Sequence, residues 1–410
     1  MIRMKYCRAC MILFLMSASL GLFGAEITVP RMELATRGAE EDGVFALSST
    51  AAVDIALDGR YKFGVLLGLS FDAADLGKAL AYRNFGVVPL DTGEPVDADA
   101  YNQLVDRYNN QATLSFRIAK AIARDLFGQP LEFSYFAGIN DPFCSGEEFA
   151  SRYGLFDIST QFTGFYYFPK GIGNNPRRRY NGLYSVQGMG ASFALTKWEN
   201  CIPMLYVYQD FSIYNGTELI FSKPRFSCDL RLIINRPKFQ AEAYAGVSGS
   251  KGEKNEIRAG ILAFFRSDKG TEFLLQCGIP GWKVDDEFSI DNLYMLFEPR
   301  LHFGTFSLYT TFFYHPLEYL HIKTEEERGK ADINIKFLFG DLEKSNVQGG
   351  FEITTGVKVY TMSDYYIALS PVISFLGSGL QWDVKLRLDL LAWETPGKLF
   401  EFFTGVKTSY

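Results

Sequence analysis

Charged residues alternate with apolar residues near the end of the chain, and they are the side chains with the clearest capacity for chemistry. Charges occupy every second position from Asp383 to Asp389, with valine and leucine between them. Successive side chains of an extended chain point to opposite faces, so this pattern predicts a strand with one charged and one apolar face. Such a face can line water or form a salt-bridged interior, and its mixed signs allow both. Residues of this kind in several segments are the candidate pore-lining set: Arg231, Lys336, Lys358, Asp383, Lys385, Arg387, Asp389, Glu401 and Lys407.

Three adjacent arginines, Arg177, Arg178 and Arg179, form a second candidate site. They follow Asn-Asn-Pro in a chain whose formal net charge is −6. Folded into a lumen, the cluster would raise the local concentration of anions and favour acidic solutes. As part of a solvated loop it would instead meet anionic glycolipid at the cell surface, and the sequence leaves both interpretations open.

The residue types that most often carry catalysis or bind metals do not form a recognisable motif. Asp141, Cys144 and Ser145 lie together in a turn, but no base accompanies them and the chain has no Gly-x-Ser-x-Gly elbow. The three histidines lack the spacing and the carboxylate support of a metal site. We therefore expect no enzymatic activity, no metal and no cofactor.

Four cysteines lie outside the N-terminal segment, and none of them belongs to a Cys-x-x-Cys pair. An even number permits disulfides in an exported protein, yet these residues are far apart and mostly lie in strand-like segments. Buried thiols and disulfides are both open interpretations. The sequence does not define a pairing of Cys144, Cys201, Cys228 and Cys277.

Alternation with a period of two residues predicts the fold class. From residue 43 onward, apolar and polar positions alternate in segments of about 10–15 residues that end at Gly, Pro, Asn or Asp. Such segments are longer than the strands of soluble sandwiches and suit strands that cross a bilayer. Aromatic residues make up 16% of the chain, enough for girdles at both membrane interfaces. We predict an all-β, transmembrane antiparallel meander β-barrel of about 16–18 strands, with 14 also possible; a soluble exported β-protein is the alternative.

The predicted barrel occupies residues 43–410, and other regions complete the domain organisation. Residues 1–25 have the basic, apolar, small-residue order of a secretory signal peptide, with cleavage between 21 and 25. Residues 26–42 are assigned to a periplasmic or lumenal segment. Residues 73–110 are assigned to a loop or plug insertion within the barrel.

The order of long and short connections gives a conflict near the N-terminus. Counting strands back from Tyr410, placed in the periplasm, puts the long connections on the outer side, as outer-membrane barrels have them. Counting forward from residue 43 puts the stretches 73–110 and 141–154 on the periplasmic side instead. Either one early strand is miscounted, or part of this region folds inside the barrel. A short helix predicted at 98–109 is a candidate to plug the barrel or to dock against its wall, and a helix in a mobile loop is the alternative.

The whole chain resembles the outer-membrane β-barrel class, through its N-terminal signal and the way it ends. Its last residues, Gly405-Val-Lys-Thr-Ser-Tyr, are similar to the C-terminal insertion signal that the barrel-assembly machinery reads. The candidate residues of this signal are Gly405, Val406, Thr408 and Tyr410. The abundance of Phe and Tyr is similar to that of uncharacterised spirochaetal outer-membrane barrels. A weaker resemblance links the chain to long-chain fatty-acid transporter barrels.

These resemblances imply an outer-membrane location, with outer-membrane lipids and the barrel-assembly machinery as partners. The expected function is a channel or transporter for small nutrients, whose solute the sequence does not identify. The alternative is a surface-binding or structural barrel with a filled lumen, and a further alternative is uptake of hydrophobic compounds like that of fatty-acid transporters. The negative net charge argues against a nucleic-acid partner.

Overall fold

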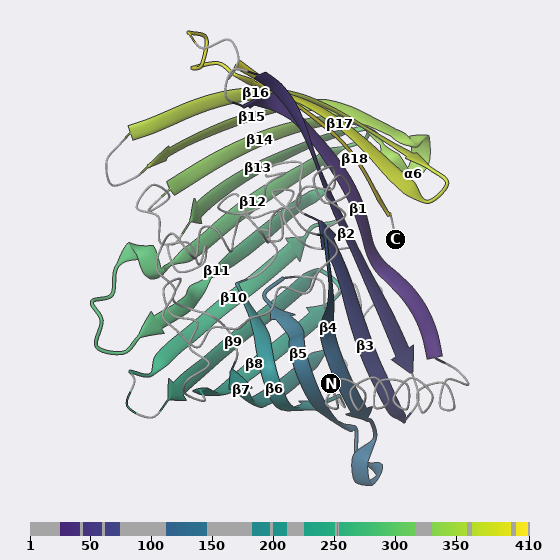
Figure 1. Cartoon of the computed structure of the whole chain (residues 1–410), viewed down its shortest axis with the longest axis vertical. Coiled ribbons are helices and arrows are strands. Elements are labelled where there is room, and N and C mark those ends of the chain that lie inside the picture. The colour runs from purple at the N-terminus through teal and green to yellow at the C-terminus, as the bar shows by residue number, and fades with distance from the viewer. Residues whose placement is uncertain are drawn as a thin grey trace, which may run out of the picture.

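Eighteen strands make up nearly all of the part of the chain that the computed structural model describes (Figure 1). This part comprises residues 25–41, 44–59, 62–73, 112–145, 183–196, 200–210, 225–250, 252, 254–315, 330–358, 363–394 and 399–408. The strands are β1 (Ala25–Glu41), β2 (Val44–Gly59), β3 (Phe63–Ala73), β4 (Ala112–Ala123), β5 (Leu131–Phe143), β6 (Tyr184–Leu195), β7 (Cys201–Asp210), β8 (Arg225–Arg236), β9 (Phe239–Ser250), β10 (Glu256–Arg266), β11 (Thr271–Lys283), β12 (Tyr294–Phe303), β13 (Phe306–His315), β14 (Lys330–Asp341), β15 (Val347–Lys358), β16 (Ser363–Gly377), β17 (Leu380–Asp389) and β18 (Phe400–Thr408). The connections contain two 3-10 turns, η1 (Leu126–Gly128) and η3 (Ile290–Asn292), and the short helix α6 (Leu342–Ser345). Within these ranges no helix has the length and apolar character needed to cross a membrane.

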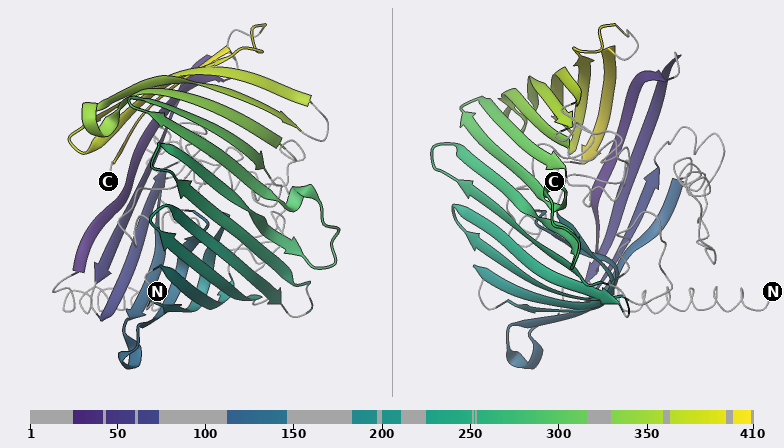
Figure 2. Two further views of the ribbon diagram at one scale, coloured as in Figure 1. Left: turned by 180° about the vertical axis from the view of Figure 1, so that it is seen from behind. Right: turned by 90° about the vertical axis from the view of Figure 1, so that its left-hand side faces the viewer.

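The strands form one ring of antiparallel neighbours, which follow one another in chain order from purple to yellow (Figure 2). Each strand pairs with the strands before and after it in the sequence. β1 also pairs with β18, from Glu33 opposite Lys407 to Gly38 opposite Phe402. The predicted all-β antiparallel meander is therefore confirmed, and its strand number lies at the upper end of the predicted range. The smaller number of 14 strands, which the sequence left possible, is wrong.

The two faces of the ring differ in chemistry, and β8 shows the rule. Its residues Phe226 and Leu230 point outward and are 61% and 58% exposed, whereas Ser227, Asp229 and Arg231 point inward and are buried. A soluble protein keeps most of its large apolar side chains inside, whereas this ring also exposes many of them on its outer face. Its interior holds buried polar residues together with an apolar cluster that includes Ile233, Leu262 and Phe264. An outer surface of this kind suits lipid, and pairing around the ring satisfies backbone groups that lipid cannot.

Aromatic side chains gather on the outer face near the short turns. Phe303 and Phe306 stack across the β12–β13 turn with ring centroids 6.3 Å apart, and Phe306 contacts Phe339 of β14 at 5.2 Å. Phe375 and Trp382 stack in the same way across the β16–β17 turn. Rings at this level suit the interface between hydrocarbon and water.

The N-terminal strand corrects the predicted domain boundaries. The prediction of a periplasmic or lumenal segment at 26–42 is wrong, because Ala25–Glu41 is strand β1 and pairs with both β2 and β18. Its alternation is hard to recognise because it contains Pro30 and an irregular register between Thr28 and Arg31. The barrel wall therefore begins with this strand.

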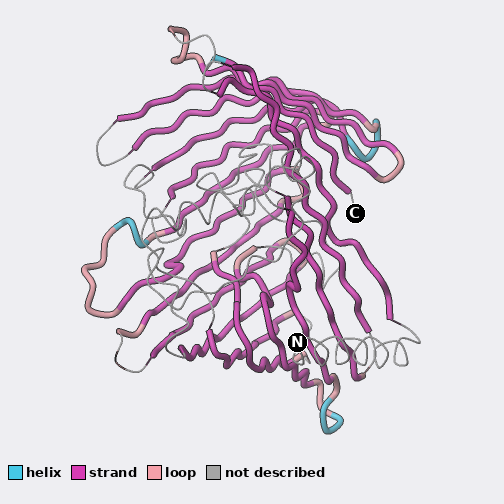
Figure 3. Tube along the Cα trace, in the orientation of Figure 1, coloured by secondary structure: helices cyan, strands magenta, loops and turns pink. Residues whose placement is uncertain are grey.

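The added strand also resolves the conflict over the long connections. With β1 counted, β3 and β4 are joined at the same end of the ring as β5 and β6, and as β13 and β14. The short turns lie at the other end (Figure 3). The sequence 155–168 also alternates like a strand, but β5 pairs directly with β6, so no strand lies between these two in the wall.

Three further sequence predictions lie outside the described residues. They are the signal peptide, the insertion between β3 and β4, and the helix at 98–109.

Candidate functional site

A ribbon of two strand ends leaves the wall and enters the barrel. This inner ribbon comprises residues 139–145 and 183–187, and it starts at Gly138, whose φ of +114° suits glycine. A Cβ at Gly138 would lie 2.3 Å from the carbonyl oxygen of Arg117, where β4 has an irregular register. β4 pairs with β5 as far as this glycine, whereas β5 and β6 stay paired beyond it. The part of β5 after Gly138 and the part of β6 before Gly188 therefore bend away from β4 together.

Glu242, on the inner face of β9, anchors the tip of the inner ribbon. Its Oε1 accepts hydrogen bonds from the backbone N–H of Cys144 (2.6 Å) and from Nε of Arg231 (2.8 Å). Gln276 of β11 donates to the carbonyl oxygen of Cys144 at 2.5 Å. Glu242, Arg231 and Cys144 are all essentially inaccessible to solvent. The ribbon therefore lies across the inner face of β8, β9 and β11.

Arg231 and Tyr206 hold the residues just before this tip. Nη2 of Arg231 donates to the carbonyl oxygen of Pro142 at 3.1 Å, and its guanidinium lies 5.0 Å from the centre of the Phe143 ring. The hydroxyl of Tyr206 donates to Asp141 at 2.7 Å. Desolvated cation–π contacts contribute about 2 kcal/mol. The ribbon is thus fixed by charge, hydrogen bonds and ring packing together.

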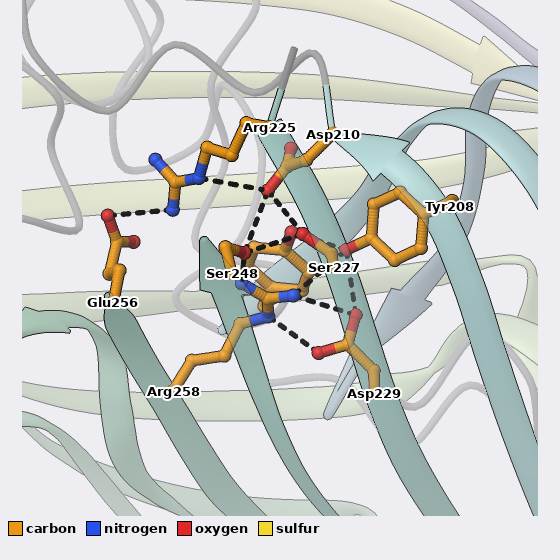
Figure 4. Close-up of polar contacts among 9 residues, drawn as sticks. Tyr208, Asp210, Arg225, Ser227, Asp229, Ser248, Glu256 and Arg258 are labelled. Atoms are coloured by element: carbon orange, nitrogen blue, oxygen red, sulfur yellow. Dashed lines mark hydrogen bonds and ion pairs between the residues drawn. The ribbon is translucent and has the colours of Figure 1, made fainter. Parts of the chain in front are cut away.

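A polar network beside the inner ribbon connects it to β7, β8 and β10 (Figure 4). Arg258 donates from Nε and Nη2 to the two carboxylate oxygens of Asp229, at 2.7 and 2.9 Å. Tyr208 donates to the same carboxylate at 2.7 Å. The guanidinium of Arg258 also lies 4.4 Å from the centre of the Tyr184 ring, which belongs to the ribbon.

The second half of this network lies where β7 and β9 end and where β8 and β10 begin. Asp210 accepts hydrogen bonds from the hydroxyls of Ser227 and Ser248, at 2.9 and 3.0 Å (Figure 4). Arg225 lies 3.7 Å from the same carboxylate and 2.8 Å from that of Glu256. Because carboxylates and guanidinium groups alternate here, the network leaves little net charge on this part of the wall.

Replacement of one ion in this network is expected to destabilise the barrel strongly. Arg258→Met leaves Asp229 buried without its main partner, which costs about 3–5 kcal/mol. The double variant Arg258→Met/Asp229→Leu removes both charges and should recover most of this loss. Urea unfolding in lipid vesicles, followed by tryptophan fluorescence, measures both. Equal stability of the single variant and the unmodified protein would contradict the prediction.

Glu352 organises the wall on the side of β14–β17. Its carboxylate lies 3.1 Å from Nζ of Lys385 and 3.9 Å from Nζ of Lys336. Asn334 donates to the same carboxylate at 3.0 Å. Two of the candidate pore-lining residues therefore share one buried carboxylate that the sequence analysis did not select.

The remaining candidates of β17 and β18 lie nearer the ends of the wall. Glu401 forms ion pairs with Arg37 and with Arg387, the latter at 3.6 Å. Asp383 is buried and accepts from Gln381 at 2.8 Å.

Asp389 accepts from the backbone N–H of Leu391 at 3.1 Å and so caps the turn after β17. Lys407 is half-buried and pairs in register with Gln381, whereas the side chain of Lys358 lies outside the described part. The role of this whole set as pore lining stays a prediction.

The two other predicted sites are only partly visible. Arg177, Arg178 and Arg179 lie outside the described residues, as does Tyr410. Gly405, Val406 and Thr408 belong to β18, where Gly405 pairs with Ala35. The Thr408 hydroxyl accepts a hydrogen bond from the backbone of Met32 at 3.3 Å. Gly405, Val406 and Thr408 are therefore part of the seam that joins the last strand to the first, and their role as an insertion signal for the barrel-assembly machinery stays a prediction.

Sequence reasoning missed Glu242, Gln276 and Arg258 as site residues. Arg258 alternates with the apolar residues of β10 and could have been selected by the rule that found Arg231. Glu242 stands between alanines, Ala241 and Ala243, so its strand has a weak apolar face. The bonds that make Glu242 an anchor come from β5 and β8, which no local pattern shows.

The cysteines and acidic residues show no metal or disulfide chemistry within the described ranges. Cys144, Cys201, Cys228 and Cys277 are all free thiols there. Cys144 is buried inside the barrel and Cys228 is exposed on its outer face. No group of three His, Cys, Asp or Glu side chains in these ranges could hold a metal ion.

Comparison with known proteins gives matches of structure but not of sequence. No protein-family model and no curated protein matches the chain. The crystal structure of Acinetobacter baumannii OccAB3 matches with a TM-score of 0.50 at 12% identity, covering 94% of this chain and 98% of that one. The chain has a porin-like fold. The prediction of an outer-membrane-type β-barrel is therefore confirmed at the level of fold.

Two other solved structures have slightly lower scores. A mutant of the Rh. blastica porin has a TM-score of 0.49 at 9% identity, covering 94% of this chain and 100% of that one. The outer membrane protein opdK from Pseudomonas aeruginosa has a TM-score of 0.46 at 8% identity, covering 94% and 98%. The resemblances to spirochaetal barrels and to fatty-acid transporters gain no support from these matches.

Proposed function

We propose that this protein is an outer-membrane channel for small solutes, in which the inner ribbon narrows the lumen. The observation that carries the proposal is the apolar outer face of a ring of strands whose interior holds ion pairs. Apolar side chains such as Phe226 and Leu230 point outward, while ion pairs such as Arg231–Glu242 lie inside. A ring of 18 strands is wide enough for an aqueous lumen unless other parts of the chain fill it. The likeness to OccAB3 supports the fold on which the proposal rests.

The inner wall favours selection of solutes by size over selection by charge. Asp229 is matched by Arg258, and Glu352 by two lysines. Strong ion selectivity needs a ring of one sign of charge, and the described wall alternates the two signs instead. Small hydrophilic nutrients of either charge fit such a path. The effect of the arginines at 177–179 on anion preference stays a prediction.

Swelling of vesicles tests this proposal directly. Vesicles that contain the refolded protein are placed in isotonic solutions of sugars of increasing size. We expect rapid swelling with monosaccharides and slower swelling as the sugar grows, because the inner ribbon limits the free path. Swelling no faster than that of protein-free vesicles, for every sugar, would contradict a channel.

The inner ribbon also supports the alternative of a structural or surface-binding barrel. Its residues Phe143 and Val186 have no exposed surface, so this part of the lumen is packed as densely as a protein core. If packing continued across the whole lumen, solutes would not pass. The swelling experiment separates the two functions, since a filled barrel leaves the vesicles impermeable.

The fold gives no support to a transporter of hydrophobic compounds that has an N-terminal plug. That function would place the first residues of the mature chain inside the lumen. Residues Ala25–Glu41 instead form β1 and are part of the wall.

Two partners follow from the proposed location. The apolar outer face implies contact with outer-membrane lipids, and the seam of β18 with β1 implies assembly by the barrel-assembly machinery.

A further inference from the structure

The connection between β11 and β12, residues 284–293, is an ordered loop at the outer end of the ring; we call it the outer foot. Its first residue, Val284, donates a backbone hydrogen bond to Asn255 of the neighbouring connection at 2.8 Å. Lys254 of that connection forms an ion pair with Asp286 at 2.8 Å. Ser289 and Asn292 close the second half of the foot by a side-chain bond of 2.9 Å and a backbone bond of 3.1 Å. The foot therefore has a defined shape.

The outer foot exposes large apolar side chains in spite of this order. Phe288 and Ile290 are 47% and 49% exposed. Exposed apolar side chains on a well-bonded loop are a candidate contact surface where they continue a larger apolar face. Figure 1 shows the foot protruding beyond the outline of the strands, at the end of β11 and β12.

Trp282 shows which side of the wall the apolar residues belong to. It pairs in register with Ile257, which points outward from β10 with Ile261 and Phe265. Phe288 packs edge-on against Trp282, with ring centroids 5.7 Å apart and planes at 88°. The indole N–H donates to the carbonyl oxygen of Asp286 at 3.2 Å, so its polar group remains satisfied within the foot. The foot thus extends the lipid-facing surface past the end of the strand.

We propose that the outer foot lies on the membrane surface, with Phe288 and Ile290 inserted among the lipid headgroups of the outer leaflet. The exposed side chains of Asp285, Asp286 and Glu287 limit the depth of insertion, since charges are costly in hydrocarbon. A tryptophan beside an apolar pair at this level is the composition of an interfacial anchor. The foot then holds β11 and β12 at a fixed height in the bilayer. This inference rests on the proposed membrane barrel.

Site-specific photocrosslinking tests the outer foot in the full mature protein. Benzoylphenylalanine replaces Phe288 or Ile290, one at a time, and the protein is refolded into vesicles of phosphatidylcholine and phosphatidylglycerol. Illumination followed by intact-protein mass measurement shows whether a lipid is attached. Phe265, 42% exposed on the outer face of β10, is the positive control for the wall. Phe127, 93% exposed in η1 at the opposite end, controls for the apolar character of the probe itself.

The expected result is lipid adducts at Phe265, Phe288 and Ile290, and none at Phe127. Adducts at Phe265 without adducts at Phe288 and Ile290 overturn the outer foot and leave the proposed barrel intact. Absence of adducts at all positions, Phe265 included, overturns the membrane barrel and the foot together. Adducts at Phe127 equal to those at the foot also overturn the inference. Benzoylphenylalanine would then bind lipid at any exposed position, whatever its place in the fold.

Discussion

Glu242→Ala is expected to raise the single-channel conductance of the reconstituted protein, because it removes the anchor that holds the inner ribbon across the lumen. The backbone N–H of Cys144 loses its acceptor, and Arg231 loses the carboxylate that fixes its guanidinium against Phe143. Cys144 then keeps the bond from Gln276 to its carbonyl oxygen and the contact of its thiol with the backbone oxygen of residue 242. Current steps at fixed voltage in a planar bilayer measure the change.

The same substitution also destabilises the barrel, and a paired variant separates the two effects. Removal of one partner of a buried ion pair costs about 3–5 kcal/mol, whereas replacement of both partners by apolar residues is often neutral. Arg231→Met/Glu242→Leu should therefore regain stability while the conductance stays raised. Unchanged conductance in both variants would show that the ribbon does not narrow the path.

Gly138→Ala is expected to prevent most of the protein from reaching its folded state. The φ of +114° is strained for any residue with a Cβ, by about 1–3 kcal/mol, and the added atom would meet the Arg117 carbonyl oxygen at 2.3 Å. Backbone on both strands would have to move at the point where β5 leaves β4. The folded fraction is measured by the heat-dependent shift in gel mobility after refolding into vesicles.

Gly349→Ala is the matched control for this experiment. Gly349 also lies in a wall strand, β15, but the nearest atom to its added Cβ would be 3.7 Å away, which is ordinary contact. We expect this variant to fold like the unmodified protein. Equal folded fractions for the two glycine variants would mean that the bend at Gly138 can be made without glycine.

The alternating strands could be predicted from the sequence because the pattern is local. In the first halves of β8 and β10, charged or small residues such as Asp229 and Arg258 occupy the inner face and apolar residues the outer face, so these strands follow from periodicity alone. Further along both strands the inner face becomes apolar, at Ile233, Leu262 and Phe264. β1 was missed because Pro30 and a register shift interrupt the same pattern. One missed strand was sufficient to put two long connections at the wrong end of the barrel.

The inner ribbon could not be predicted, because its causes are not local. Gly138 resembles any other strand glycine until the carbonyl group of Arg117 is placed opposite it. Glu242 and Cys144 are far apart in the sequence, and their contact depends on the bend. The candidate lysines were easier to find than their partners: Lys336 and Lys385 alternate visibly, but their shared carboxylate, Glu352, is recognised only when β14, β15 and β17 are placed in space.

Single-channel recording in planar lipid bilayers is the most direct test of the central claim that this ring is a channel. The mature protein, refolded and inserted from dilute detergent, should give discrete current steps of uniform size. The channel should remain open at low voltage. It should show only a weak preference between small cations and anions, because the described inner wall alternates charges. A folded, inserted protein, shown by its gel mobility shift, that gives no current steps would contradict the account and favour a filled structural barrel.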